Sequence, residues 1–240
     1  MYCEYYQVRS GFPALIKTLF NSGNIVYDEL RDYANERNTI DISPIMIKFI
    51  EPNINQIPHK YVHSKNYLKE YARQFLSKNN MGFEYTYGER LLAYPNGNID
   101  QIALNVVCRL RANILSRRAT ATTIVHDLDL GRSDVPCLQV IDFKFDMNSN
   151  KLNMIAYFRS QDIMALPANV YGLSALLQAV SKALIVDSGS ITLVDGSLHA
   201  YERSFEYLAS LVYGKKDATS VIKSITRKVK QNKYNMENMA

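Results

Sequence analysis

The sequence predicts a single α+β domain, and three observations support this class. Apolar residues recur at helical spacing in several segments, they alternate with polar residues after Cys137, and the segments do not follow a regular βαβ order. The chain has 240 residues, of which 47% are hydrophobic, so it can form one substantial core without dividing into two domains. We therefore expect one mixed β-sheet packed with helices across residues 1–240.

Three amphipathic helices are expected in the first half of the chain, because apolar residues recur every three or four positions. The first carries Leu15 and Leu19 and precedes Gly23. The second follows Ser64, a suitable N-cap, and its apolar face consists of Tyr67, Tyr71 and Phe75. The third and clearest face consists of Ile99, Ile102, Val106, Leu110 and Ile114.

A β-hairpin is expected directly after Cys137, where the apolar period changes from helical spacing to two. Residues 141–146 alternate between apolar and charged side chains, which is typical of a half-buried strand. A polar turn at residues 148–150 follows, and then a second alternating segment consisting of Leu152, Met154, Ala156 and Phe158. The second strand is expected to end at Arg159 and Ser160.

The remaining elements are a helix, a short strand and a further helix. The first helix has an apolar face of Leu173, Leu176, Val180 and Leu184. The short strand passes through Ile191 and Leu193, and the last face consists of Tyr201, Phe205, Leu208 and Val212. We expect residues 51–60 and the last ten or so residues to be irregular.

The composition indicates a soluble, cytoplasmic protein with free thiols. No apolar run approaches the roughly 20 residues that a bilayer crossing needs, and the first ten residues do not resemble a targeting segment. The cysteines, Cys3, Cys108 and Cys137, are odd in number and widely spaced, so neither a disulfide framework nor a zinc site is expected. We expect no metal.

The net charge of +5 is concentrated in a basic C-terminal segment, residues 214–240. Between positions 215 and 233 one acid, Asp217, accompanies the basic residues Lys215, Lys216, Lys223, Arg227, Lys228, Lys230 and Lys233. A solvated helix face is the favoured interpretation, and a contact with RNA or another polyanion is the less favoured one.

Three segments carry residues suited to chemistry: SRRATATT from Ser116, VPCLQ from Val135 and FRSQDIMALPANVYGL from Phe158. Each has an ordinary structural interpretation. A cysteine at the head of a strand is often a small buried apolar residue, adjacent arginines are often a solvated pair, and Asn169 before a helix is a common N-cap. Their order and spacing together carry the functional argument.

The set resembles the thymidylate synthase family, in which an Arg-Arg pair precedes a Pro-Cys nucleophile, followed by Arg-Ser-x-Asp and Leu-Pro-x-Asn. DGSLHAYER from Asp195 looks like the family's Asp-x-His-x-Tyr segment, although Ser197 replaces the aspartate. FEYTYGERL from Phe83 is similar to the family's Tyr-Gly segment, especially in the short archaeal-type members. The resemblance covers roughly residues 83–210.

This resemblance implies a role for each matching residue. Cys137 would add to C6 of a pyrimidine nucleotide, with Tyr87 beside it, because a thiolate suits reversible addition. The implied phosphate ligands are Arg159 and Ser160, together with Arg117 and Arg118 from the other subunit of a symmetric homodimer formed through the sheet face, and Arg31 as a weaker candidate. His199 and Tyr201 would bind the sugar, although His199 could instead be a core histidine.

Asn169 offers both a donor and an acceptor, so it can match the N3–H and O4 groups of uracil. This favours dUMP as the substrate. The resemblance implies 5,10-methylenetetrahydrofolate as the one-carbon donor, with Asp162 facing its pterin. The family's general acid/base is a glutamate from an early helix, for which we choose Glu70, with Glu84 and Glu89 as alternatives.

Several departures from the family concern the fate of the carbon attached to C5. The chain has no tryptophan, Ile124 stands where one is common, and QNKYNMENMA replaces the usual closing C-terminal segment. A wetter site would favour addition of water over hydride. These departures weaken the expectation of methylation without removing it, so we still expect methylation of dUMP, with hydroxymethylation of dUMP, dCMP or CMP as the first alternative. A non-catalytic nucleotide- or RNA-binding protein is a more distant alternative.

Overall fold

The protein folds as two β-sheets packed with helices, which confirms the α+β class. The computed structural model describes residues 1–27, 38–52, 57–95, 97–132 and 134–237. The larger sheet has six strands, in the spatial order β1 (Tyr2–Tyr5), β4 (Ile45–Phe49), β9 (Asp187–Asp195), β7 (Lys151–Phe158), β6 (Leu138–Asp146) and β5 (Thr120–Thr122). The smaller sheet has the order β2 (Asn24–Tyr27), β3 (Asn38–Ile42), β10 (Leu198–Tyr201) and β8 (Gln161–Asp162).

Three chain segments link the larger sheet and the smaller one through short connections. β3 leads into β4, β7 into β8 and β9 into β10, and we call the region where these connections lie side by side the crease. At the crease, the amide of Gly196 donates to the carbonyl of Phe158 at 2.8 Å. A Cβ at Gly196 would lie 2.8 Å from the carbonyl oxygen of Arg159, so the close approach of these two chains requires glycine.

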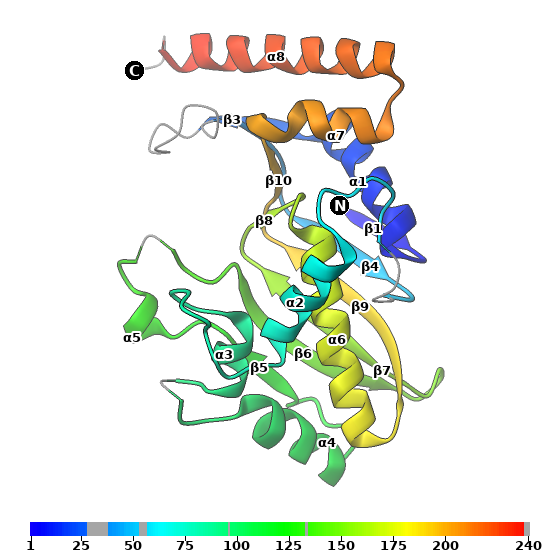
Figure 1. Cartoon of the computed structure of the whole chain (residues 1–240), viewed down its shortest axis with the longest axis vertical. Helices are drawn as coiled ribbons and strands as arrows, with labels where there is room; N and C mark the ends of the chain where they lie inside the picture. Colours follow the sequence, from blue (N-terminus) through cyan, green and yellow to red (C-terminus); the bar gives the residue numbers. More distant parts are fainter. Residues whose placement is uncertain (28–37, 53–56, 96, 133, 238–240) are drawn as a thin grey trace.

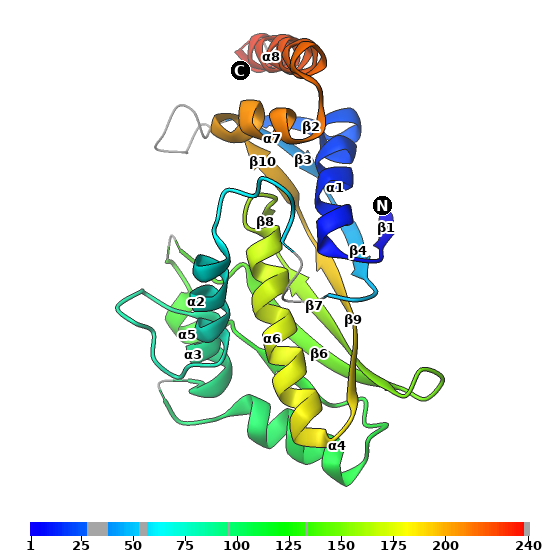
Figure 2. The ribbon, with the colours of Figure 1, turned by 45° about the vertical axis from the view of Figure 1, so that its right-hand side comes forward.

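The helices cover one face of the larger sheet and the top of the smaller sheet (Figure 1). They are α1 (Val8–Ser22), α2 (Lys65–Phe75), α3 (Tyr87–Leu92), α4 (Cys108–Ala112), α5 (His126–Asp129), α6 (Leu166–Leu184), α7 (Phe205–Val212) and α8 (Lys215–Glu237). The central helix is α6, which packs against β7, β9 and α2. Figure 2 shows α6 and α2 in front of the sheet, with α8 at one end of the long axis and α4 at the other.

The expected β-hairpin is confirmed, and its alternation matches the observed burial. Strands β6 and β7 pair antiparallel around the turn at residues 147–150. The inward residues of β7 are fully buried, whereas Ile155 and Tyr157 point outward and are each 39% exposed. Ser64 also caps α2 as expected, since its hydroxyl accepts a hydrogen bond from the amide of Tyr67.

Four expectations about element boundaries need correction. The helix expected from Ile99 begins as a π-helical segment, Ile102–Val107, because Ile99 pairs with Tyr94 in a turn. Tyr201 ends strand β10, and helix α7 starts only at Phe205. The short strand through Ile191 is the nine-residue β9, and the chain expected to be irregular near its end continues in α8 as far as Glu237.

Candidate active site

A pocket of about 510 Å³ opens between α2, α3 and the loop that leads into β6. Its volume suits a small-molecule ligand. Aromatic side chains dominate the lining, and three carboxylates accompany them: the residues are Tyr67, Glu70, Tyr71, Gln74, Phe75, Phe83, Glu84, Tyr85, Thr86, Tyr87 and Asp134. Flat rings can stack on such a surface.

Cys137 is half-buried directly before β6, in the same loop as Asp134, which lines the pocket. Its carbonyl accepts a hydrogen bond from the amide of Arg159 at 2.9 Å, and the next amide, that of Leu138, donates to the hydroxyl of Tyr87 at 3.5 Å. Cys137 forms no disulfide within the described residues. The strand end therefore fixes the backbone that carries the thiol.

Three tyrosines that line the pocket, Tyr71, Tyr85 and Tyr87, interact electrostatically with Cys137. The pKa of each hydroxyl is raised, mainly by burial and further by charge on Cys137. All three hydroxyls therefore stay protonated at neutral pH. Neutral hydroxyl dipoles make a thiolate less costly than a purely apolar environment would.

Asn169 lies in the first turn of α6 and is 4% exposed. Its Oδ1 atom accepts a hydrogen bond from the hydroxyl of Tyr71 on α2 at 2.7 Å. The two helices approach closely because Gly172 leaves room for the ring of Phe75, which would lie 2.3 Å from a Cβ at that position. Tyr71, which lines the pocket, thus interacts with both the buried amide of Asn169 and the thiol of Cys137.

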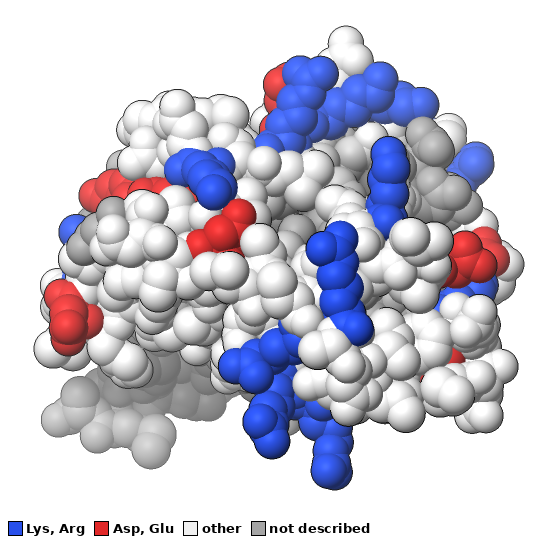
Figure 3. Space-filling model, turned by 90° about the horizontal axis from the view of Figure 1, so that it is seen from below, with Lys and Arg blue, Asp and Glu red and all other residues white. Residues whose placement is uncertain are grey.

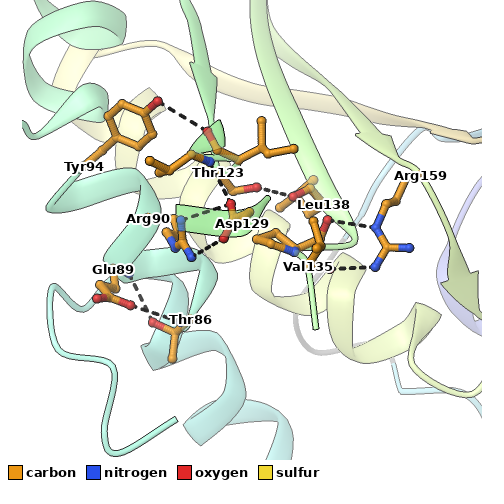
Figure 4. Close-up of polar contacts among 12 residues, drawn as sticks. Thr86, Glu89, Arg90, Tyr94, Thr123, Asp129, Val135, Leu138 and Arg159 are labelled. Atoms are coloured by element: carbon orange, nitrogen blue, oxygen red, sulfur yellow. Dashed lines mark hydrogen bonds and ion pairs between the residues drawn. The ribbon is translucent and has the colours of Figure 1, made fainter. Parts of the chain in front are cut away.

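Arg159 follows β7 and turns its guanidinium toward the loop that precedes the cysteine (Figure 4). Nη2 donates to the carbonyl of Val135 at 2.7 Å, and Nε donates to the carbonyl of Pro136 at 3.3 Å. Arg159 is exposed to solvent, so it remains accessible to an anion. This arrangement places a permanent positive charge next to Cys137.

A buried ion pair supports the same loop from the other side (Figure 4). Arg90 on α3 donates to both carboxylate oxygens of Asp129, at 2.7 and 3.2 Å. Asp129 also accepts the amide of Val125 at 2.7 Å, and the hydroxyl of Thr123 donates to the carbonyl of Leu138. These contacts tie α3, α5 and the head of β6 together.

His199 and Tyr201 lie in β10, next to the crease. His199 is buried, its ring meets the ring of Tyr201 edge-on, and its Nδ1 atom is 3.5 Å from the hydroxyls of both Ser160 and Ser197. Ser197 in turn donates to Asp41, which pairs with His199 across β3 and β10. The carboxylate expected at position 197 is therefore replaced by a serine that is bonded to a carboxylate from another strand.

Asp162 lies in β8, and one carboxylate oxygen accepts the amide of Met164 at 2.9 Å. Burial raises the pKa of Asp162 to about 6, despite the opposing effect of this hydrogen bond. A carboxyl group with this pKa can exchange a proton near neutral pH. Its sheet partner is His199.

The remaining sequence-based candidates lie apart from Cys137 or outside the described residues. Glu70 lines the pocket, but its carboxylate forms an exposed ion pair with Arg73 at 2.5 Å. Arg117 and Arg118 are exposed in the loop between α4 and β5, at the end of the molecule where Figure 3 shows many projecting basic side chains. Arg31 lies outside the described residues.

The sequence interpretation missed the polar roles of Tyr71, Asp41 and the pair of Arg90 and Asp129. Tyr71 was assigned only to the apolar face of a helix. The hydroxyl on that face was the available signal, because a buried tyrosine hydroxyl usually needs a partner. No comparable local signal identifies Asp41 or the ion pair, since their partners are distant in sequence.

Two further findings concern membrane-spanning helices and metal ligands. No helix in the described part of the chain combines the length and apolar character that a bilayer crossing requires. Across the same residues, no three His, Cys, Asp or Glu side chains are grouped so that they could hold a metal ion.

A thiol, a buried amide and an arginine near an aromatic pocket are groups that can carry out covalent chemistry on an anionic ring compound. Comparison with known proteins identifies the family. The sequence model of thymidylate synthase matches residues 45–240, so the chain belongs to the thymidylate synthase family.

Several archaeal relatives, provisionally named as thymidylate synthases, agree with this assignment. The chain is 36% identical to the Methanosarcina barkeri protein over 196 residues, which is 81% of this chain and 86% of the relative. It is 35% identical to the Methanosarcina mazei protein, over 83% of this chain and 88% of the relative. For the Methanocaldococcus jannaschii protein the identity is 32%, over 84% and 91% of the two chains.

Proposed function

We propose that this protein is a thymidylate synthase that methylates dUMP at C5 of the pyrimidine, using 5,10-methylenetetrahydrofolate. The observation that carries the proposal is that Cys137 and Asn169 both interact with Tyr71, which lines the pocket, while Arg159 binds the loop that leads to Cys137. Family membership supplies the reaction class, and the relatives' provisional names agree with it.

In this proposal Cys137 performs the first chemical step. Its thiolate forms a bond to C6 of the uracil, and the electron pair of the C5–C6 double bond moves toward O4 and makes C5 nucleophilic. Asn169 stabilises the charge on O4 by donating from its amide nitrogen. After C5 has bonded to the one-carbon unit and lost its proton, the bond from that carbon to the folate nitrogen would break and leave a methylene on C5. Hydride added to this methylene would complete the methyl group, restore the C5–C6 double bond and expel Cys137 from C6 as the thiolate.

Phosphate binding is assigned to Arg159 and Ser160, with the partner subunit's Arg117 and Arg118 completing the site in a homodimer. Exposed Arg117 and Arg118 support this assignment, because neither belongs to the pocket of its own chain. The outer face of the larger sheet supports a dimer as well, since Met46, Ile155 and Tyr157 leave apolar surface exposed there.

The residues present fit the folate co-substrate. The aromatic lining of the pocket suits the pterin and aryl rings, and Asp162 offers a buried carboxyl to the pterin. When bound, the folate supplies one carbon at the oxidation level of formaldehyde and, for methylation, a hydride. Glu70 remains our candidate for the proton transfers, and its exposed pairing with Arg73 requires it to reorient.

Hydroxymethylation by the same addition mechanism is the second candidate. The specific observation in its favour is the position of α8, which packs on α7 and β2, well away from the pocket between α2 and α3 (Figure 1). The described chain therefore provides no closing segment over the pocket, and water could add to the intermediate.

The two reactions are distinguished by their products. The protein is incubated with methylenetetrahydrofolate and, separately, dUMP, dCMP or CMP, and the mass of each nucleotide product is measured. We expect a methyl product from dUMP together with dihydrofolate. A hydroxymethyl product together with tetrahydrofolate would establish the second candidate instead. No product, together with no covalent complex with 5-fluoro-dUMP, would exclude both.

The nucleophile is tested by Cys137→Ser. We expect turnover to fall by several orders of magnitude while dUMP still binds, because the phosphate and base ligands remain. Cys108→Ser is the matched control, since Cys108 is exposed on α4 and should leave turnover unchanged. If Cys137→Ser retains turnover, Cys137 is not the nucleophile. If the variant loses dUMP binding along with the fold, Cys137 has a structural role.

A further inference from the structure

Tyr71 joins helix α2 to the base-reading amide of the site. Its hydroxyl donates to Oδ1 of Asn169 at 2.7 Å. The preceding residue, Glu70, pairs instead with Arg73. A phenol, rather than a carboxylate, thus contacts the amide.

This contact selects one of two possible orientations of the carboxamide. A carboxamide can be flipped so that its oxygen and nitrogen exchange places, which reverses its donor and acceptor positions. Burial raises the pKa of the Tyr71 hydroxyl, so it keeps its proton, and in the observed orientation it donates that proton to Oδ1 of Asn169. In the flipped orientation two donors would face each other unless the hydroxyl proton found another acceptor.

The two orientations read different bases. Uracil presents a donor at N3 and an acceptor at C4, whereas cytosine presents an acceptor at N3 and a donor at C4. The Oδ1 atom has two lone pairs, so it can accept the Tyr71 hydroxyl and the N3–H of uracil at the same time. Flipping the amide to suit cytosine would break the contact with Tyr71.

We infer that Tyr71 is a specificity-determining residue, which holds Asn169 in the orientation that reads uracil and disfavours cytosine. This inference rests on the proposed function, because it requires Asn169 to contact the base. The hydroxyl acts through Asn169 and is not assigned a chemical step. The hydroxyl is therefore expected to affect which nucleotide binds, and not the rate at which Cys137 bonds to C6.

The test compares Tyr71→Phe with a matched control, Tyr85→Phe. The phenylalanine at 71 keeps the ring packed against Phe75 and removes only the hydroxyl. Tyr85 also lines the pocket and interacts with Cys137, but Asn169 is not its partner. Dissociation constants for dUMP and dCMP are measured calorimetrically for the wild type and both variants, with the unfolding temperature as a check on folding.

We expect the wild type to prefer dUMP, and the ratio of the two constants to fall about tenfold in Tyr71→Phe, the size of one net hydrogen bond. In Tyr85→Phe the ratio should stay within about twofold of the wild-type value. An unchanged ratio in Tyr71→Phe overturns this inference and leaves the proposed function intact. A wild type that binds neither nucleotide, or that prefers dCMP, overturns both.

Discussion

Two buried carboxylates in different regions of the molecule have opposite surroundings. Asp129, beneath the loop before Cys137, is 4% exposed and receives hydrogen bonds from Arg90 and from the amide of Val125. Asp195, where β9 enters the crease, is 0% exposed, and neither of its oxygens has a hydrogen-bond partner within the described residues. Burial raises the pKa of Asp195 to about 8.

The difference shows two ways of burying an acid. At Asp129 the charge is compensated by Arg90, and the ion pair ties α3 to α5, next to the loop before Cys137. At Asp195 the protein avoids the cost of a buried charge by keeping the group protonated. Asp129 therefore helps to hold its region in place, whereas Asp195 makes the stability of the protein depend on pH.

Removing the cation of the first pair should have the largest effect. We expect Arg90→Met to lower the free energy of unfolding by about 3–5 kcal/mol, because Asp129 would be left charged and buried. Urea denaturation at pH 7 measures this change. The double variant Arg90→Met with Asp129→Leu should recover much of the loss. A single variant as stable as the wild type would show that the pair is not structurally important.

Asp195→Asn should have a smaller effect of opposite sign. Between an unfolded pKa of about 3.9 and the folded pKa of about 8, the native state holds a proton that the unfolded state has released, so stability falls as pH rises through this range. An asparagine does not ionise, so Asp195→Asn should not lose stability as the pH rises. We expect its free energy of unfolding to exceed that of the wild type by about 1–3 kcal/mol at pH 8 and to differ little at pH 4. Thermal unfolding across this pH range measures the difference. Equal effects at both pH values would contradict the neutral-acid interpretation.

The smallest effect is expected from Ser197→Ala, which tests an intermediate case. Asp41 has a raised pKa because burial outweighs the lowering effects of Ser197 and Ser43, and losing the Ser197 hydroxyl should raise it further. We expect a loss of about 0.5–1.5 kcal/mol near pH 7, the value of one hydrogen bond. Asp41 titration is followed by NMR. An unchanged Asp41 pKa in Ser197→Ala would show that the Ser197 hydroxyl does not stabilise the Asp41 carboxylate.

Local sequence patterns predicted the parts of the fold that depend on near neighbours. The β6–β7 hairpin, the Ser64 cap and the face of α6 follow from spacing within one segment, and all three are confirmed. The strands of the smaller sheet were not predicted. β3 and β10 pair across more than 150 residues, and the alternation within β3, where Ile40 and Ile42 are buried, is too short to identify a strand by itself.

The candidate site was predictable to the extent that its residues form ordered motifs. Cys137, Arg159 and Asn169 were found in this way, and their roles remain proposals. Tyr71 was assigned to the core because its spacing is that of an apolar helix face, and only the tertiary contact with Asn169 reveals the hydroxyl's partner. The partnership of Ser197 with Asp41 likewise depends on strand register.

The crease also determines where the chain can change in length. The connections near Ser43, Ser160 and Gly196 lie side by side, so an inserted residue in any one of them would shift the register of a strand in both sheets. Candidate phosphate and sugar ligands would move together as a result. The turn at residues 147–150 has no such link, which makes it the better position for an inserted label or affinity tag.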